Sequence, residues 1–138
     1  MAERFIYVTE VDMARLRALL ESTRASGWRD RDHLQALEDE LDEAHVVPPE
    51  AIPSDVVTMN SRVRVSDLTA GRQHTISIVF PSDANADDGK VSIVAPLGTA
   101  LLGYRAGTTV QWTVPGGQRS LRIDEILYQP EAAGHDHR

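Results

Sequence analysis

Two stretches decide the fold, Met13-Ala-Arg-Leu-Arg-Ala-Leu-Leu-Glu-Ser-Thr23 and Leu34-Gln-Ala-Leu-Glu-Asp-Glu-Leu-Asp-Glu-Ala44. Both place apolar or small residues at spacings of 3, 4 and 3, through Met13, Leu16, Leu20 and Thr23 in the first and Leu34, Leu37, Leu41 and Ala44 in the second. Such spacing puts the repeated residues on one face of a helix. Two helices with matching stripes and a short connection are expected to fold back as an antiparallel coiled-coil hairpin. Each arm would have about 15 residues and a length of roughly 22 Å, at a rise of 1.5 Å per residue.

The residues around these stretches mark where the helices begin and end. Thr9 and Asp12 resemble a capping box before the first helix, and Gly27 stands where a left-handed residue commonly ends one. Pro48 ends the second helix, because proline removes a hydrogen-bond donor and disfavours helix in the residue before it. The apolar run at residues 5–8 predicts a short strand that supports the hairpin, and residues 46–56 are expected to form a linker.

After residue 56 the pattern changes to a period of two. Val57, Met59, Ser61, Val63 and Val65 alternate with polar residues, which is typical of a half-buried strand. Further strands are expected over residues 75–80, 91–94, 109–114 and 120–128, with a polar turn over 67–71, a short helix over 97–102 that Pro96 opens, and a frayed tail over 129–138. The predicted fold class is α+β, with a short helical hairpin over residues 1–48 followed by an antiparallel sheet domain with one short helix over residues 49–138.

Length and composition are those of a small globular protein. The chain has 138 residues, of which 41% are hydrophobic and 25% charged. There is no cysteine, which excludes a disulfide scaffold, a thiolate metal site and a cysteine nucleophile. No apolar run approaches the roughly 18 residues of a membrane span, and the first residues do not resemble a secretion signal. The sequence therefore predicts a cytoplasmic protein with no membrane partner.

The net charge of −7 is unevenly distributed. Residues 1–55 carry six arginines and thirteen acidic residues, whereas residues 56–138 carry eight basic and eight acidic residues. A free-standing nucleic-acid binder is expected to show a basic surface, because phosphate neutralisation supplies most of its affinity. The sequence therefore disfavours direct binding to nucleic acid and favours a partner with a basic groove or a cation-rich site.

Residues suited to catalysis or metal binding are scarce. The five histidines lie in no nucleophile motif, and His135-Asp136-His137 is terminal with no further ligands nearby, whereas a structural metal site needs four anchored ligands. Gly98, Gly103 and Gly107 follow a predicted strand but do not form a phosphate-binding glycine motif. The sequence therefore predicts no catalytic residues, no cofactor and no metal.

The expected hairpin tip carries Trp28, Asp30 and Asp32. One interpretation is that Asp30 or Asp32 caps the second helix, which stabilises it by about 0.5–2 kcal/mol per cap. The other is that these carboxylates contact a partner or offer oxygen ligands to Mg²⁺. Trp28 is either an exposed interface anchor or folds back over Leu34. The other carboxylates between residues 32 and 44, where no lysine or arginine occurs, are expected to form a solvated helix face.

The C-terminal part resembles the Gre-factor superfamily, the GreA/GreB transcription elongation factors. The resemblance is carried by Val91-Ser-Ile-Val-Ala-Pro-Leu-Gly-Thr-Ala-Leu-Leu-Gly103, Gly107, Val114-Pro-Gly-Gly117 and Ile126-Leu-Tyr128. Within the superfamily the chain is most similar to the Rnk group, named for regulation of nucleoside diphosphate kinase, through Asp55-Val-Val-Thr-Met-Asn-Ser-Arg-Val63, residues 95–103 and Tyr128-Gln-Pro-Glu-Ala-Ala-Gly134. The resemblance spans residues 10–134. It implies a coiled-coil hairpin joined to an FKBP-like domain, with RNA polymerase as partner.

Gre factors insert their hairpin into the secondary channel of RNA polymerase, where two acidic residues at its tip help to hold a catalytic Mg²⁺ and stimulate transcript cleavage. The hairpin expected here is much shorter, so its tip should not reach the polymerase active centre. Gre factors can also carry an Asp-Ser-Pro triplet before the short docking helix. Val94, Ala95 and Pro96 occupy those positions, so the charge of that contact is absent.

The resemblance therefore implies a non-enzymatic, monomeric regulator at the channel entrance. Its predicted docking patch is Val94, Ala95, Pro96 and Leu97, with Leu97 as a partly exposed apolar centre and Leu101 in the core. In the alternative interpretation of the patch, Pro96 only starts the helix and Leu97 only covers the sheet.

Three alternative functions remain open. The first is a Gre-like factor that stimulates transcript cleavage. The second is a regulator of nucleoside diphosphate kinase that acts independently of polymerase, either through physical contact with the kinase or through an indirect effect on gene expression. The FKBP-like fold also suggests a peptidyl-prolyl isomerase, but such a pocket needs aromatic walls, and residues 56–138 offer only Phe80, Tyr104, Trp112 and Tyr128.

Overall fold

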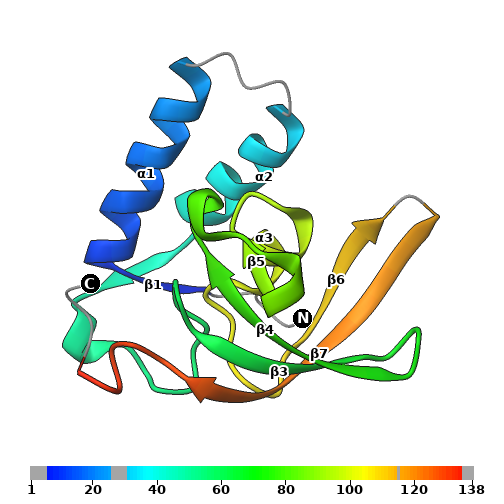
Figure 1. Ribbon diagram of the computed structural model, residues 1–138. Coiled ribbons are helices and arrows are strands. Elements are labelled where there is room, and N and C mark those ends of the chain that lie inside the picture. The colour runs from blue at the N-terminus through cyan, green and yellow to red at the C-terminus, as the bar shows by residue number, and fades with distance from the viewer. Residues whose placement is uncertain (1–5, 26–30, 115, 135–138) are drawn as a thin grey trace.

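A computed structural model describes residues 6–25, 31–114 and 116–134 of the chain (Figure 1). In element order it comprises β1 (Tyr7–Thr9), α1 (Glu10–Ala25), α2 (Arg31–Asp42), β2 (His45–Val47), β3 (Arg62–Asp67), β4 (Arg72–Val79), β5 (Lys90–Ser92), α3 (Pro96–Leu101), β6 (Thr109–Val114) and β7 (Gly117–Tyr128). Three short 3₁₀ helices, η1 (Pro49–Ala51), η2 (Pro81–Asp83) and η3 (Ala86–Asp88), lie in the connections. The class is mixed helix and sheet, as predicted.

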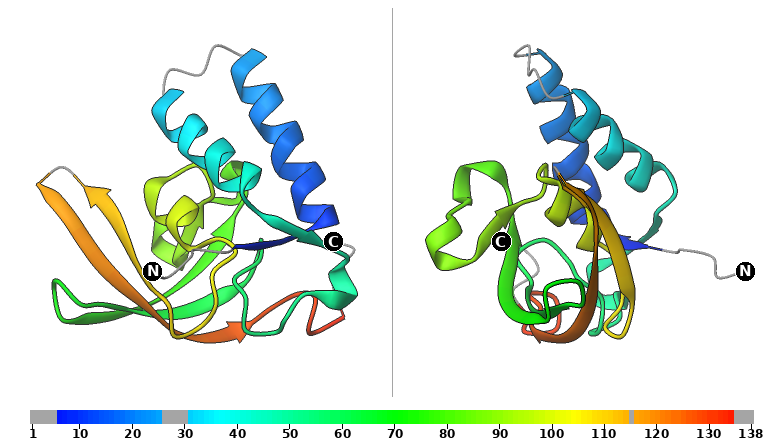
Figure 2. Two further views of the ribbon diagram at one scale, coloured as in Figure 1. Left: turned by 180° about the vertical axis from the view of Figure 1, so that it is seen from behind. Right: turned by 90° about the vertical axis from the view of Figure 1, so that its right-hand side faces the viewer.

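The helices α1 and α2 run antiparallel and stand together above the sheet (Figures 1 and 2). Two ion pairs across them have the order that an antiparallel pair requires. Arg17, in the middle of α1, meets Asp42 at the end of α2 at 2.9 Å, and Arg24, near the end of α1, meets Glu38, one turn earlier in α2, at 2.7 Å. The predicted helical stripes are confirmed, since Leu16, Leu20, Leu34, Leu37 and Leu41 are all buried in one hydrophobic cluster with Met13 packed against it.

The strand and linker expected beside the hairpin differ from the structure. The first strand is Tyr7–Thr9, and the expected linker contains strand β2, which pairs with β1 in parallel. The His45 N–H donates to the Ile6 carbonyl at 2.9 Å, so both ends of the hairpin are tied into one small sheet. The prediction of a linker over residues 46–56 was wrong in this part, because the strand partner of His45–Val47 lies 38 residues away in the register Tyr7↔His45.

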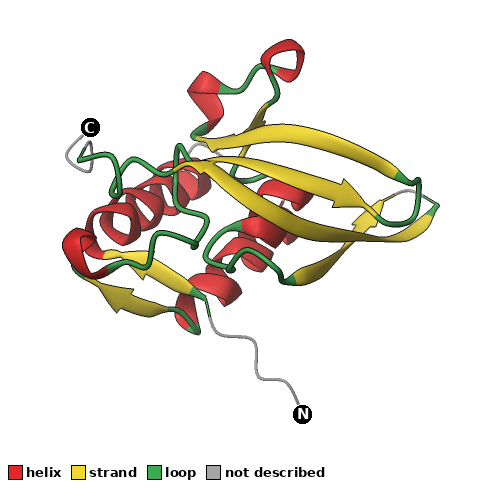
Figure 3. Cartoon of the chain, turned by 90° about the horizontal axis from the view of Figure 1, so that it is seen from below, coloured by secondary structure: helices red, strands yellow, loops and turns green. Residues whose placement is uncertain are grey.

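The main sheet has five strands in the order β5-β4-β3-β7-β6 and curls around α3 (Figures 2 and 3). The expected hairpin of β6 and β7 and the turn after Asp67 are confirmed. The expectation of a purely antiparallel sheet was wrong at one edge, because β5 pairs with β4 in parallel. The chain between them makes the two 3₁₀ turns η2 and η3, which return it to the edge of the sheet in the direction of β4.

Strand β3 begins at Arg62, later than the alternating pattern predicted. Asn60 has a φ of 66°, and the Ser61 N–H donates to the Thr58 carbonyl at 3.0 Å, so residues 58–61 form a turn. A residue in the left-handed region cannot continue a strand. Val57 and Met59 are nevertheless buried, which explains why they share the pattern of the strand that follows.

The segment after β7 is docked on the body of the protein up to Glu131, whereas the sequence predicted a frayed tail. Gln129 is 4% exposed, and its Nε2 donates to the carbonyls of Pro53 at 2.8 Å and Val56 at 2.9 Å. Tertiary partners 73 and 76 residues away therefore hold this segment.

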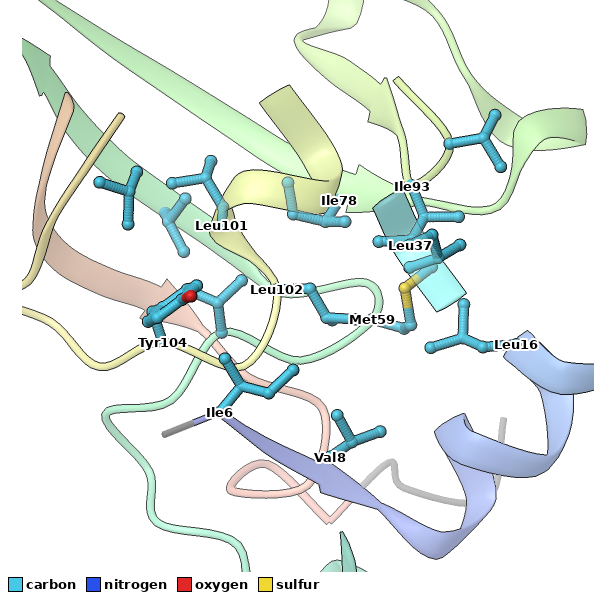
Figure 4. Packing of buried hydrophobic residues seen from close by; sticks show 14 of the residues in the cluster. Ile6, Val8, Leu16, Leu37, Met59, Ile78, Ile93, Leu101, Leu102 and Tyr104 are labelled. Atoms are coloured by element: carbon cyan, nitrogen blue, oxygen red, sulfur yellow. The ribbon is translucent and has the colours of Figure 1, made fainter. Parts of the chain in front are cut away.

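One hydrophobic cluster connects the hairpin to the sheet (Figure 4). Leu16 and Leu37 from the helices lie close to Met59 and Ile93. From the N-terminal strand region, Ile6 lies beneath Leu102 and Val8 lies beneath Met59. Removing this apolar surface from water stabilises the arrangement of hairpin and sheet together.

Candidate functional site

The segment that contains the predicted docking patch, Val94–Leu97, joins β5 to α3 and is held by hydrogen bonds. The Ile93 N–H donates to the Val79 carbonyl at 2.8 Å, and the Ala95 N–H donates to the Ser92 carbonyl at 3.0 Å. The Thr99 Oγ1 donates back to the Ile93 carbonyl at 2.7 Å, across the first turn of α3. Pro96 stands at the first position of the helix, where its missing N–H costs nothing. The segment therefore has one well-defined backbone path.

The four patch residues differ in exposure. The side chain of Val94 is buried, at 7% exposure, whereas Ala95, Pro96 and Leu97 are half-buried. Leu101 is fully buried, as predicted, and Leu97 packs partly against the core. A partner that touches this surface would therefore contact Ala95, Pro96 and Leu97. The buried Val94 side chain would not contact the partner and would only anchor this segment to the core.

Gly98 fixes how close α3 lies to β5. A Cβ atom added at residue 98 would stand 2.3 Å from the Ser92 carbonyl oxygen and 3.0 Å from the Ile93 Cα. Both atoms belong to the backbone and cannot rotate away. Only glycine therefore fits this contact without movement of the helix, and the position of the patch depends on it.

The residues predicted at the hairpin tip are not brought into a described site. Trp28 and Asp30 lie outside the described residues. Asp32 belongs to the first turn of α2, and its side chain is also outside the description. Their roles as caps, partner contacts or cation ligands stay predictions.

Two acidic residues expected on a solvated face of α2 instead join the helices. Arg24 donates from Nη1 to Glu38 Oε2 at 3.0 Å and from Nη2 to Oε1 at 2.7 Å, and this paired contact lowers the pKa of Glu38. Arg17 donates to Asp42 at 2.9 Å. Asp39 and Glu43 are exposed, as predicted, so part of the acidic surface on the outer side of α2 is free to meet a cationic partner.

Asp12 is a functional candidate that the sequence pattern assigned to a helix cap. The Asp12 N–H does donate to Thr9 Oγ1 at 3.0 Å, as the cap requires. The Asp12 carboxylate points elsewhere, because its Oδ2 accepts the Met59 N–H at 3.1 Å. Burial raises the pKa of this carboxyl to about 7, against the lowering effect of the Met59 hydrogen bond. The signal was present in the sequence, since Asp12 stands four residues before Leu16, on the buried side of the helix.

No constellation for metal or membrane chemistry is found in residues 6–25, 31–114 and 116–134. Within these ranges, no three histidine, aspartate or glutamate side chains gather as metal ligands would. None of the helices there has the length and apolar character needed to cross a bilayer.

Comparison with known proteins gives two family matches that together cover most of the chain. The model described as "Transcription elongation factor, GreA/GreB, C-term" matches residues 52–128, and the model described as "Rnk N-terminus" matches residues 4–47. The boundary between the two matches falls within the connection between β2 and β3.

Similar proteins agree with both matches. The chain is 40% identical to the "Regulator of nucleoside diphosphate kinase" of Escherichia coli K12, over 97% of each chain. It is 30% identical to the transcription elongation factor GreA of Sulfurovum sp., over 96% of this chain and 85% of that one. Among solved structures, a GreA/GreB transcription elongation factor from Nitrosomonas europaea superposes with a TM-score of 0.72 at 40% identity, covering 89% of this chain and 99% of that one.

Proposed function

The chain belongs to the GreA/GreB family of transcription elongation factors and has an Rnk-type N-terminus, and from that premise we propose that it is a non-enzymatic regulator that binds RNA polymerase near the secondary channel without stimulating transcript cleavage. It would act in the cytoplasm as a monomer. The observation that carries the proposal is the similarity to a regulator of the Rnk type along 97% of the chain, hairpin included.

The length of the hairpin supports binding without cleavage. Helix α1 has 16 residues and α2 has 12, which correspond to about 24 Å and 18 Å at 1.5 Å per residue. We interpret the pair as a shortened counterpart of the coiled-coil hairpin of Gre factors, and residues 49–138 as the Gre-type FKBP-like domain. A carboxylate ligates Mg²⁺ only at about 2.0–2.1 Å. If the sheet domain docks as in Gre factors, Asp30 and Asp32 would stop short of the active centre.

The surface that we assign to docking is the patch beside α3, with the hairpin tip as a second contact. Ala95, Pro96 and Leu97 are half-buried on a backbone path held by hydrogen bonds, so binding would order few additional groups. An apolar side chain on such a rigid turn is suited to be the centre of an interface. The acidic hairpin would add attraction toward basic surfaces at the channel entrance.

Direct binding is tested with purified RNA polymerase core enzyme and a labelled GreA as competitor. We expect saturable binding that GreA displaces and that weakens as salt rises from 0.05 to 0.3 M, mainly through the association rate, because exposed charges are screened within about 10 Å at 0.1 M. Binding that is insensitive to salt, or that GreA does not displace, would contradict a shared site. Adding the protein to a backtracked complex should release no cleaved transcript, and cleavage lost in the Asp30→Asn, Asp32→Asn double variant would overturn that part of the proposal.

The name of the Escherichia coli relative supports a second candidate, regulation of nucleoside diphosphate kinase independently of polymerase. A pull-down from cell extract, scored for polymerase subunits and for the kinase, separates the two. Recovery of the kinase without polymerase would favour the second candidate.

The patch itself is tested by Leu97→Asp, with Leu68→Asp as a matched control. Leu68 is 47% exposed on the turn after β3, so the control adds the same charge at an exposed leucine outside the patch. We expect Leu97→Asp to weaken polymerase binding about tenfold or more with little change in melting temperature, and the control to change neither. If Leu97→Asp instead lowers the stability by several kcal/mol, as burial of an unpaired charge does, Leu97 is a core residue and the patch lies elsewhere.

A further inference from the structure

Asp12 joins the helical hairpin to the sheet domain through a buried contact. It lies in the first turn of α1 and is 6% exposed. Its Oδ2 accepts the N–H of Met59, which lies 47 residues away in the turn that precedes β3. Met59 and Leu16, one helical turn after Asp12, are both fully buried in the cluster between the two parts (Figure 4). The carboxyl group therefore lies at the end of the hairpin that is attached to the sheet domain. A small rotation of α1 at this point would displace the far end of the hairpin by a larger distance.

The charged groups that act on Asp12 come from two directions. Glu131, in the docked C-terminal segment, acts on it as a like charge, and Arg15 on α1 acts as an opposite charge. Glu131 is held in place because Thr58 Oγ1 donates to its Oε1 at 2.7 Å, and Thr58 is in turn joined to Ser61 by a hydroxyl–hydroxyl bond of 2.8 Å. The turn that precedes β3 thus donates to both carboxylates, through the Met59 N–H to Asp12 and through the Thr58 hydroxyl to Glu131.

We infer that Asp12 is a positioning residue whose protonation state controls how firmly the helical hairpin is seated on the sheet domain. This inference rests on the proposed function in one respect, namely that polymerase must meet the hairpin and the patch beside α3 in a fixed relative orientation. Asp12 would touch no partner itself. Its effect would reach the partner through the angle and the mobility of α1.

The direction of the effect follows from burial. A buried carboxyl is more easily accommodated when neutral, and Glu131 adds repulsion when both groups are ionised. Accordingly the pKa of Asp12 is raised, to about 7 from 3.8. A raised pKa means that the contribution of Asp12 to the seated state is fully present below pH 3.8 and is lost as the pH rises through 7. The seating of the hairpin should therefore weaken as the pH rises from 3.8 to about 7, and it should change little above pH 8.

The first test follows the junction in the wild-type protein without any partner. The ¹H,¹⁵N resonance of the Met59 amide is recorded from pH 5 to 9, together with residual dipolar couplings of amides in α1 and β7. We expect the Met59 resonance to titrate with a midpoint near 7. We also expect a single alignment tensor to fit both elements at pH 6 and to fit them less well at pH 8.5. A midpoint near 4, or the same tensor fit at both pH values, would overturn the inference.

The second test compares Asp12→Asn with the control Asp87→Asn, a change at an exposed carboxylate of η3 that lies outside both the hairpin and the patch beside α3. Wild type and control should bind polymerase core enzyme several-fold more weakly at pH 8 than at pH 6.5, whereas Asp12→Asn should bind equally at both. If Asp12→Asn keeps the pH dependence of wild type, Asp12 is not its source and the inference is wrong. If no variant binds polymerase, the proposed function fails, and the Met59 titration still decides the role of Asp12, also where the variant does not fold.

Discussion

Replacing Gly98 with alanine is the sharpest test of how α3 is placed. The added Cβ would lie 2.3 Å from the Ser92 carbonyl oxygen and 3.1 Å from the Ser92 carbonyl carbon. An ordinary contact at this point needs about 3.4 Å, so α3 and β5 must separate by about 1 Å. Overpacking of this kind costs about 1–3 kcal/mol, and the cost should lie near the upper end because both obstructing atoms are backbone atoms. Alanine recovers about 1 kcal/mol through its higher helix propensity, which leaves a net loss of about 2 kcal/mol.

The measurement is urea denaturation followed by circular dichroism, with Gly116→Ala as the matched control. Gly116 lies in the turn between β6 and β7, and a Cβ added there would meet nothing within 4 Å. We expect the midpoint to fall for Gly98→Ala at an unchanged m-value and to stay near wild type for Gly116→Ala. Displacement of α3 should also weaken polymerase binding, because the patch begins at the same helix. Equal stability of the two variants would refute the argument that Gly98 is required for close contact with β5.

Two further changes test the core and the acid limit of stability. Leu37→Ala should lower the free energy of unfolding by about 2–5 kcal/mol, because Leu37 is fully buried between hairpin and sheet, and a loss under 1 kcal/mol in urea denaturation would show that the two parts do not share a core. Asp67→Asn should lower stability at pH 7 and flatten the loss of stability below pH 4. The Asp67 carboxylate accepts hydrogen bonds from the N–H groups of Ala70 and Thr69 and pairs with Arg119, and these contacts lower its pKa. The contribution of Asp67 to the free energy of unfolding is therefore present above pH 3.8 and is lost as the pH falls. Thermal melts of variant and wild type at pH 3 and pH 7 check this, and parallel pH profiles would contradict it.

The elements that the sequence predicted well are those determined by neighbouring residues. The spacing of Leu34, Leu37 and Leu41 defines a helical stripe whatever it packs against, and the turn after Asp67 follows from hydrogen bonds between Asp67 and residues two to four positions later. The short helix after Pro96 has the same origin, since proline favours its first position. Periodicity and capping act over a few residues, so a single sequence carries them in full.

The candidate site was accessible to sequence reasoning only in part. Residues 94–97 were predicted from their resemblance to Gre factors, and the half-burial of Leu97 from its place beside a proline. Burial of Val94 could not be predicted, because it depends on the curl of the sheet around α3 (Figure 3). The ion pair between Arg24 and Glu38 likewise depends on the register of the two helices.

The contacts between segments that are distant in the sequence were decided only by the tertiary structure. Strand β2 exists because β1 offers a parallel partner, and the segment after β7 is ordered because the Gln129 side chain donates to the carbonyls of Pro53 and Val56. Asp12 shows the difference most clearly, since its N–H makes the cap that the sequence predicted while its carboxylate turns inward to Met59. A cap requires only the residues beside it, whereas a buried carboxyl requires a donor that folding brings from elsewhere in the chain, and no local pattern records that donor.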